Sequence, residues 1–247
     1  MKKQEFEVMY KLENKHWWFV GKRNLIFNFM DKLYKNKNNL NILDIGCGTG
    51  IIMQKLSKYG KVYGIDVSDD ALKFCKARNL KNIKKASVMK IPFKNNSFDL
   101  VGCFDVLYHK GINDDLKAIK EIYRVLKKSG RLLVTDSAMI CLWSKHDIAT
   151  HARQRYNKKE LKEKLEKAGF IIEKMSYYNF FLFPLVFIMR KLDNIFNKNK
   201  PAKSNIQETN PLFNKILISI FKIESKLLNF INFPFGVSIF CIAKKDF

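Results

Sequence analysis

The chain of 247 residues can form one large α/β domain or a domain with an insertion, and its hydrophobic content of 47% allows a sizeable core. The formal charge of +23 indicates attraction to nucleic acid or to an anionic membrane surface, unless it only reflects a lysine-rich composition with solvated side chains. No apolar run near the N-terminus has signal-peptide length, and none approaches the roughly 18 to 20 residues of a membrane span. The sequence therefore favours a cytoplasmic protein over a secreted or transmembrane one.

The cysteine pattern indicates neither a disulfide framework nor a metal site. Five cysteines are spread along the chain without a C-x-x-C pair. This spacing favours reduced, buried thiols, and no zinc-ligand spacing is visible. We expect no metal site.

Residues 1–39 are predicted to be helical. They contain the string HWWF, with Trp17 and Trp18 adjacent, followed by the basic pair Lys22 and Arg23. One role for this segment is hydrophobic packing against a sheet. The other is a lid that folds across the glycine-rich loop that follows.

That loop is the most informative stretch. Residues 40–45 form an apolar run typical of a buried parallel strand, and glycines follow at alternate positions, Gly46, Gly48 and Gly50. Glycines suit a turn in which a ligand lies against the main chain, because no Cβ atom intervenes and positive φ is allowed. A helix over about residues 51–59 would point its positive end at that ligand.

Asp44 narrows the choice of ligand. The dinucleotide fingerprint is G-x-G-x-x-G, whereas this chain has G-x-G-x-G with Asp44 two residues before the first glycine. A carboxylate there would repel a pyrophosphate and would suit a cation, such as the amino and sulfonium groups of S-adenosylmethionine (SAM).

The string DIGCGTG resembles the first motif of class I SAM-dependent methyltransferases. HWWF before a basic pair resembles the N-terminal segment of a bacterial branch of this family, which is type 11-like, although the pair there is usually two arginines. The resemblance implies SAM as cofactor, contacted by Asp44, Gly46, Gly48, Gly50, Trp17 of the lid, and Arg23 at the cofactor carboxylate.

A second strand is predicted over residues 61–67 and ends at Asp66 and Val67. An acidic residue at the tip of this strand is placed to accept both ribose hydroxyls of a nucleoside. The alternative is that Asp66 only caps the next helix. Ser68 is already suited to that role.

The third strand, about residues 83–87, precedes Ile91-Pro92-Phe93, which matches the family pattern. In the family an Asp that meets the adenine amino group stands where this chain has Ser87. A hydroxyl and the N–H of Val88 remain available for that contact.

A fourth strand over residues 97–104, a helix over 114–127 and a fifth strand over 131–136 complete an alternating pattern. Five strands alternating with helices predict a doubly wound, mostly parallel sheet with a Rossmann-like order. A ligand would then lie at the carboxyl ends of the strands, where Gly46, Asp66, Ser87 and Phe104 converge.

Candidate acceptor-side residues follow the fourth and fifth strands. Residues 137–156 include His151, Arg153, Arg155 and Tyr156, which form either a substrate clamp or an ordinary tether for the loop. A general base would help methyl transfer to a hydroxyl or a protonated amine, and His109 and His151 are the candidates; a carboxylate acceptor would need no base. His109 has the alternative of capping a helix or packing in the core.

A sixth strand is predicted over residues 170–177 and an antiparallel seventh over 237–244. Between them lies an apolar and basic helical insertion, 178–236, which indicates a surface for lipid or a hydrophobic substrate, or else a cap or a dimer interface. The predicted organisation is therefore a helical lid (1–39), a SAM-binding domain (40–177 and 237–247) and the insertion.

The sequence favours a SAM-dependent methyltransferase with a small-molecule or lipid-linked acceptor, in the cytoplasm or at the inner membrane face. An RNA methyltransferase is the alternative suggested by the charge, but Asp105-Val106-Leu107-Tyr108 stands where a base-methylating Asn-Pro-Pro-Tyr motif would be. A non-catalytic, membrane-associated protein that kept the fold is a third hypothesis. The intact Asp44 and Asp66 argue against it.

Overall fold

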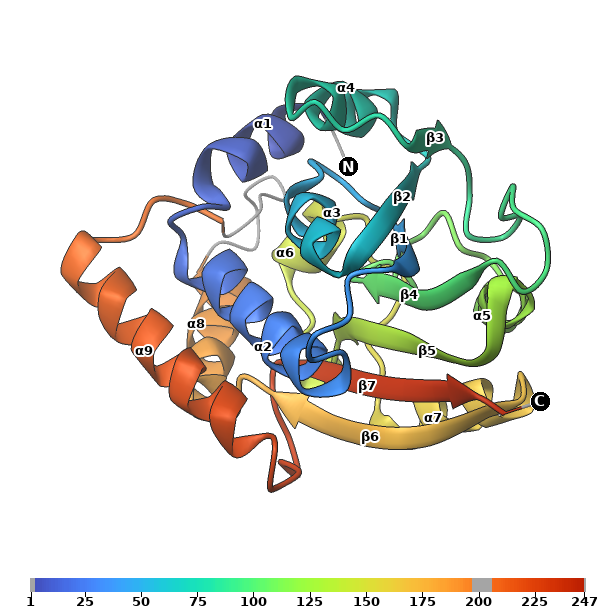
Figure 1. Ribbon diagram of the computed structural model, residues 1–247. Coiled ribbons are helices and arrows are strands. Elements are labelled where there is room, and N and C mark those ends of the chain that lie inside the picture. The colour runs from blue at the N-terminus through green and yellow to red at the C-terminus, as the bar shows by residue number, and fades with distance from the viewer. Residues whose placement is uncertain (1–2, 197–205, 247) are drawn as a thin grey trace.

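The computed structural model describes residues 3–196 and 206–246. Its seven-stranded sheet has the order β3-β2-β1-β4-β5-β7-β6 (Figure 1). Neighbouring strands are parallel except for β7, which is antiparallel to both β5 and β6. The predicted α/β class, the doubly wound sheet and the helical insertion before the last strand are confirmed. The strands are β1 (Leu40–Ile45), β2 (Gly60–Asp66), β3 (Ile83–Lys85), β4 (Phe98–Phe104), β5 (Leu126–Ser137), β6 (Phe170–Tyr178) and β7 (Ser238–Lys245).

Helices cover both faces of the sheet, which explains why its central strands are apolar on both sides. On one face, Ile26 and Phe29 of α2 pack with Ile42 and Phe240. The helices of that face are α2 (Trp17–Leu33), α3 (Ile51–Leu56) and α9 (Pro211–Leu227); α5 (Asp115–Val125) and α7 (Lys158–Lys167) cover the other. The remaining helices are α1 (Lys3–Leu12), α4 (Asp69–Ala77), α6 (Lys145–Ala149), α8 (Phe183–Phe196) and two 3-10 turns, Ser57–Tyr59 and Ile140–Leu142.

Two local expectations need correction. The helix predicted over 114–127 ends at Val125, because Leu126 is buried and already pairs with Phe98 in the sheet. Four cysteines are buried as expected, but Cys141 is exposed, since it lies on the surface turn after β5. Among the described residues, no helix combines the length and apolar content that crossing a bilayer requires.

The helix α9 of the insertion packs against α2 of the N-terminal segment. Figure 1 shows α9 running beside α2 at the edge of the molecule. Trp18 lies 6.3 Å from the ring of Phe221, and a Cβ atom on Gly21 would stand 2.0 Å from the same ring. Gly21 therefore allows α2 and α9 to approach each other closely.

This close approach predicts the effect of a single methyl group. Gly21→Ala should lower the free energy of unfolding by about 1–3 kcal/mol, because the fully buried Phe221 ring has little room to move. Chemical denaturation measures the change. Gly21→Ala should cost less stability in a Phe221→Leu background than in the wild type, because the smaller side chain leaves room for the methyl group. If the effects of the two substitutions were strictly additive, the contact between Gly21 and Phe221 would be contradicted.

Glu224 fastens α9 to the start of the insertion. Its buried carboxylate accepts the main-chain N–H groups of Asn179, of Phe180 at 2.9 Å and of Phe181 at 3.2 Å. Burial raises the pKa of Glu224 to about 6, although these three donors oppose the shift. The turn from β6 into α8 is thus held against α9.

Candidate cofactor and acceptor site

A cavity of about 700 Å³ lies at the carboxyl ends of β1, β2 and β4. Its floor consists of strand-end loops, and its walls come from α1, α2, α8, the start of α9 and the segment before α9. This volume is within the range of pockets that hold drug-sized ligands. The predicted site residues on its surface are Trp17, Gly46, Gly48, Asp66, Val67, Ser87, Val88, Phe104, His109 and Arg155.

The three glycines of the loop have two different surroundings. Gly46 and Gly48 line the cavity with φ of +65° and +54°, values that favour glycine. Gly50 also has positive φ, +83°, but a Cβ atom there would stand 2.5 Å from Leu80 and 3.0 Å from Cys75. Gly50 thus lies against the chain around α4 and does not line the cavity.

Asp66 is fixed by the same loop. Its carboxylate accepts the N–H of Gly48 at 3.0 Å and that of Ser68 at 2.9 Å. Burial raises its pKa, and these amide donors limit the rise. Ser68 is the N-cap of α4, since its hydroxyl accepts the N–H of Ala71, so Asp66 is not needed as a cap. Val67 follows it on the cavity rim.

Asp44 lies beneath the loop and is almost fully buried. Its Oδ2 atom has no hydrogen-bond partner among the described residues. Burial first, and then the nearby charge of Asp66, raise its pKa to about 8, while Lys22 opposes the rise. Asp44 is not among the described residues that line the cavity. Its unpartnered oxygen and the neighbouring carboxyl of Asp66 make the region beneath the loop favourable for a cation.

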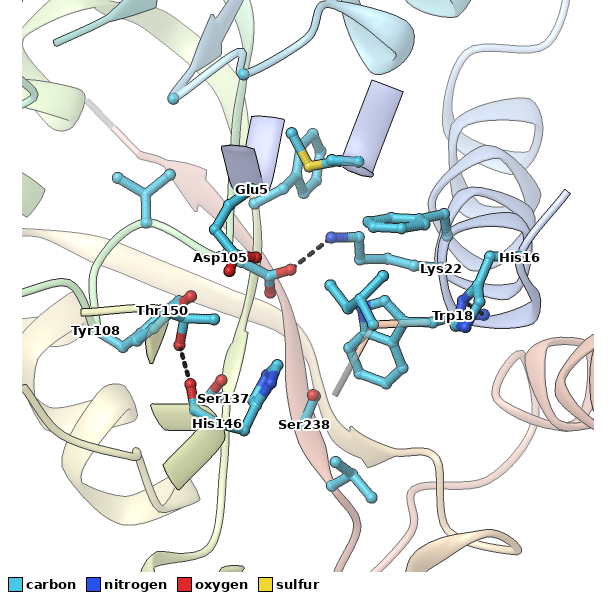
Figure 2. Close-up of a pocket in the computed structure, with 18 of the residues that line it drawn as sticks. Glu5, His16, Trp18, Lys22, Asp105, Tyr108, Ser137, His146, Thr150 and Ser238 are labelled. Carbon is cyan, nitrogen blue, oxygen red and sulfur yellow. Dashed lines mark hydrogen bonds and ion pairs between the residues drawn. The ribbon is translucent and has the colours of Figure 1, made fainter. Parts of the chain in front are cut away.

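Of the basic pair Lys22 and Arg23, it is Lys22 that lines the cavity. Figure 2 shows Lys22 reaching from α2 to Asp105, where Nζ lies 2.5 Å from Oδ2. The guanidinium of Arg23 instead donates to the main-chain oxygen of Glu13. Glu13 in turn pairs with Arg78, so Arg23 secures the connection between α1 and α2 and does not line the cavity.

Sequence reasoning missed Asp105 as a site residue. It follows β4 in the left-handed region, with φ of +58°, and its Oδ1 accepts the hydroxyl of Thr135 at 3.2 Å. The sequence feature that could have identified it is its position, because Asp105 is an acidic residue directly after the fourth strand. Lys22 and Asp105 join α2 to the floor of the cavity.

Residues of α1 and α2 lie over the loop and line the cavity. Met9 of α1 lies near Gly48, where an added Cβ would stand 3.2 Å from its Cε. Trp17 lines the cavity, and its main-chain N–H donates to the side chain of Asn214 in α9 at 2.8 Å. On the far side, the Ser87 hydroxyl accepts the N–H of Met89 at 3.1 Å, and Val88 and Phe104 complete that wall.

His109 lies on the cavity surface, with its ring centroid 5.9 Å from that of His151. Burial lowers the pKa of His109 to about 4, so the ring is neutral near pH 7. Its Nδ1 accepts the N–H of Gly111 at 3.2 Å, which leaves the ring proton on Nε2. In this state His109 offers a donor, and its low basicity suits it poorly to a general base. His151 is not among the described residues that line the cavity.

The remaining predicted acceptor residues mainly tether their loop. Tyr156 is fully buried and its hydroxyl donates to Asp115 at 2.7 Å, while Arg153 reaches the same carboxylate at 3.4 Å. Arg155 borders the cavity, but its guanidinium donates to Asp147 and to the main-chain oxygen of Ala138, both at 2.8 Å.

His146 is a further cavity residue that sequence reasoning did not select (Figure 2). Burial, and then the charge of Arg190, lower its pKa to about 4. Over residues 3–196 and 206–246, no group of three or more His, Cys, Asp or Glu side chains is placed to hold a metal ion.

The fold and the strand-end cavity together define a methyltransferase-like α/β protein, and comparison with known proteins agrees. Residues 43–134 match the family described as a methyltransferase domain. The match starts just before the glycine loop and ends within β5.

Curated relatives match less than half of the chain. An uncharacterized protein of Methanocaldococcus jannaschii is 36% identical over 121 residues, which is 44% of this chain and 51% of the relative. A demethylmenaquinone methyltransferase of Lactococcus lactis is 35% identical over 109 residues, which is 40% of this chain and 42% of the relative. The chain thus spans about half the length of the curated relatives it matches.

Solved structures extend the similarity in fold to most of the chain. A chain from the Haloferax volcanii complex that contains the Trm112 methyltransferase activator has a TM-score of 0.63 at 16% identity, covering 99% of this chain and 94% of that one. A SAM-dependent methyltransferase from Methanosarcina mazei has a TM-score of 0.57 at 16% identity, covering 88% and 97%. At these identities the comparison shows the fold alone.

Proposed function

We propose that this protein is a SAM-dependent methyltransferase that acts on a hydrophobic or lipid-linked small molecule in the cytoplasm or at the inner face of the membrane. The observation that carries the proposal is the carboxylate of Asp66 beside a glycine loop at the floor of a ligand-sized cavity, with the buried carboxyl of Asp44 beneath that loop.

The floor residues fit the cofactor. Asp66 is held at the carboxyl end of β2 on the cavity surface, and in this proposal its carboxylate accepts the ribose hydroxyls; Gly46 and Gly48 add no side chain to the cavity. The orphaned Oδ2 of Asp44 lies at the same loop, where a ligand with amino and sulfonium charges would compensate it. Ser87 and Val88 would border the adenine, and Trp17 would cover the cofactor from the lid.

Bound SAM would supply an activated methyl group, and the chain's own task is to hold the acceptor in line and exclude water. The lid and the helices α8 and α9 close the cavity above the floor. Lys22 and Asp105 place a charged pair between lid and floor, and His109 adds an N–H donor.

The upper part of the cavity supports a hydrophobic acceptor. It is lined by Leu182, Leu185 and Val186 at the start of the insertion and by Phe213 and Leu217 of α9. One relative is named demethylmenaquinone methyltransferase. A hydrophobic acceptor such as a quinone would suit these apolar walls.

Asp66→Ala tests the cofactor assignment. It should weaken SAM binding at least about tenfold, because charge-assisted hydrogen bonds to the ribose are lost together with the anchor of the Gly48 amide. Isothermal titration calorimetry measures the affinity. The matched control is Asp69→Ala, which removes an exposed carboxylate paired with Lys85 and should bind SAM as the wild type does. Unchanged affinity in Asp66→Ala would refute the ribose role.

A further inference from the structure

The helix α8 carries an apolar row that faces solvent. Six exposed side chains recur at intervals of three and four residues, which places them on one side of the helix. Their exposed fractions run from 43% to 77%, so this is not the side that packs on the protein. The six residues of this α8 row are Leu185, Ile188, Met189, Leu192, Ile195 and Phe196.

The helix α9 carries a second such row. Its inner side, with Leu217 and Phe221, is buried against the protein. Its outer side repeats apolar residues at intervals of four, four, three and four, and four of the five are at least 37% exposed. The five residues of this α9 row are Leu212, Ile216, Ile220, Ile223 and Leu227.

Lysines lie beside the apolar rows. Lys215, Lys222 and Lys226 are exposed on α9 and fall on its adjacent side, seven and four residues apart. Lys191 is exposed on α8. Of the two acidic residues in these helices, Glu224 is buried and Asp193 is half-buried, so the exposed charge of the pair is positive.

The rows adjoin the cavity. Leu185 and Met189 of the α8 row line it although they are exposed, and so does Phe213, next to the α9 row. Apolar side chains of α8 and α9 therefore lead from the exposed rows to the cavity, which the polar segment 206–210 also lines.

We propose that the α8 and α9 rows bind the surface of an anionic lipid bilayer and that the cavity takes its acceptor directly from it. The inference that the acceptor enters from the bilayer rests on the proposed function, whereas binding to the bilayer does not. Apolar rows flanked by lysines are the pattern of helices that lie in a membrane interface. The charge of +23 favours an anionic bilayer over a second copy of the same basic chain.

The test is co-sedimentation of the full-length protein with vesicles of phosphatidylcholine alone or mixed with phosphatidylglycerol. The variant Ile188→Gln/Leu192→Gln/Ile216→Gln/Ile223→Gln changes both rows but no cavity-lining residue. The wild type should bind the mixed vesicles at least about tenfold more tightly than this variant and than it binds neutral vesicles. The matched control, Ile140→Gln/Ile171→Gln, removes two exposed apolar side chains elsewhere and should bind as the wild type does.

Two further measurements keep the outcomes distinct. The four-residue variant should bind SAM with unchanged affinity in calorimetry, so a protein that binds vesicles but not SAM refutes the proposed function alone. Light scattering gives the oligomeric state. The bilayer proposal would be overturned in favour of a second copy if the wild type did not bind vesicles and formed a dimer that the four-residue variant dissociates. It would also be overturned if the wild type and this variant bound vesicles equally well.

Discussion

Replacing Asp147 with alanine is expected to lower the free energy of unfolding by about 3–5 kcal/mol, as is typical when one partner of a buried ion pair is removed. Asp147 is almost fully buried and holds two arginines. Its Oδ1 accepts Arg155 at 2.8 Å and its Oδ2 accepts Arg190 of α8 at 3.2 Å. Without the carboxylate, two largely buried guanidinium groups lose their counter-charge.

The same carboxylate also organises α6. Its Oδ2 accepts the main-chain N–H of Ser144 at 2.8 Å, which closes a capping box at the start of that helix. The loss should therefore loosen the wall that α6 and α8 form above the cavity. Chemical denaturation at pH 7 measures the destabilisation.

The matched control removes a carboxylate that is exposed to solvent instead of buried. Glu166 pairs with Lys162 at 3.7 Å on the exposed side of α7, so Glu166→Ala should change stability by less than about 1 kcal/mol. If Asp147→Ala cost no more than Glu166→Ala, Asp147 would not be the counter-ion of two buried arginines.

The floor of the site was predictable because its pattern is local. The strand β1, the glycines and Asp66 lie within 27 residues of one another, and each is placed by strand geometry and turn chemistry that the sequence displays. The alternation of strands and helices was likewise enough to predict the doubly wound sheet.

The walls of the site depend on contacts between distant parts of the chain. Lys22 and Arg23 are neighbours on one helix, so their side chains point in different directions, and the packing of Gly21 against Phe221 decides which one faces the cavity. That contact joins residues 200 positions apart. No local pattern in the sequence separates the two basic residues.

Local sequence patterns also did not predict which side chains of the insertion are buried. The insertion is visibly apolar, but only its packing on α2 shows that one side of α9 is core while the opposite row is exposed. In the same way, Arg153 and Tyr156 have the residue types of a substrate clamp. The structure places both against Asp115, which ties down their loop.

The variant Asp44→Asn should change stability and cofactor binding in opposite directions. In the protein without ligand the Asp44 carboxyl is buried with a pKa of about 8, above its ordinary value of 3.8. The folded state therefore keeps a proton that the unfolded chain releases, and stability falls as the pH rises from about 4 to about 8. Asparagine does not titrate, so the variant should be more stable than the wild type at pH 8 by about 1–3 kcal/mol, with the gap narrowing toward pH 4.

Binding should respond in the other sense, because a cationic ligand favours the ionised carboxylate. SAM affinity of the wild type should rise between pH 6 and pH 9, since binding releases the Asp44 proton, and the variant should lose about a hundredfold at pH 8 and show a flatter profile. S-adenosylhomocysteine lacks the sulfonium charge and should lose less. Thermal unfolding and calorimetry across this pH range measure both effects. A variant that is both less stable and equally able to bind SAM would show that Asp44 is a structural residue and not the partner of a cation.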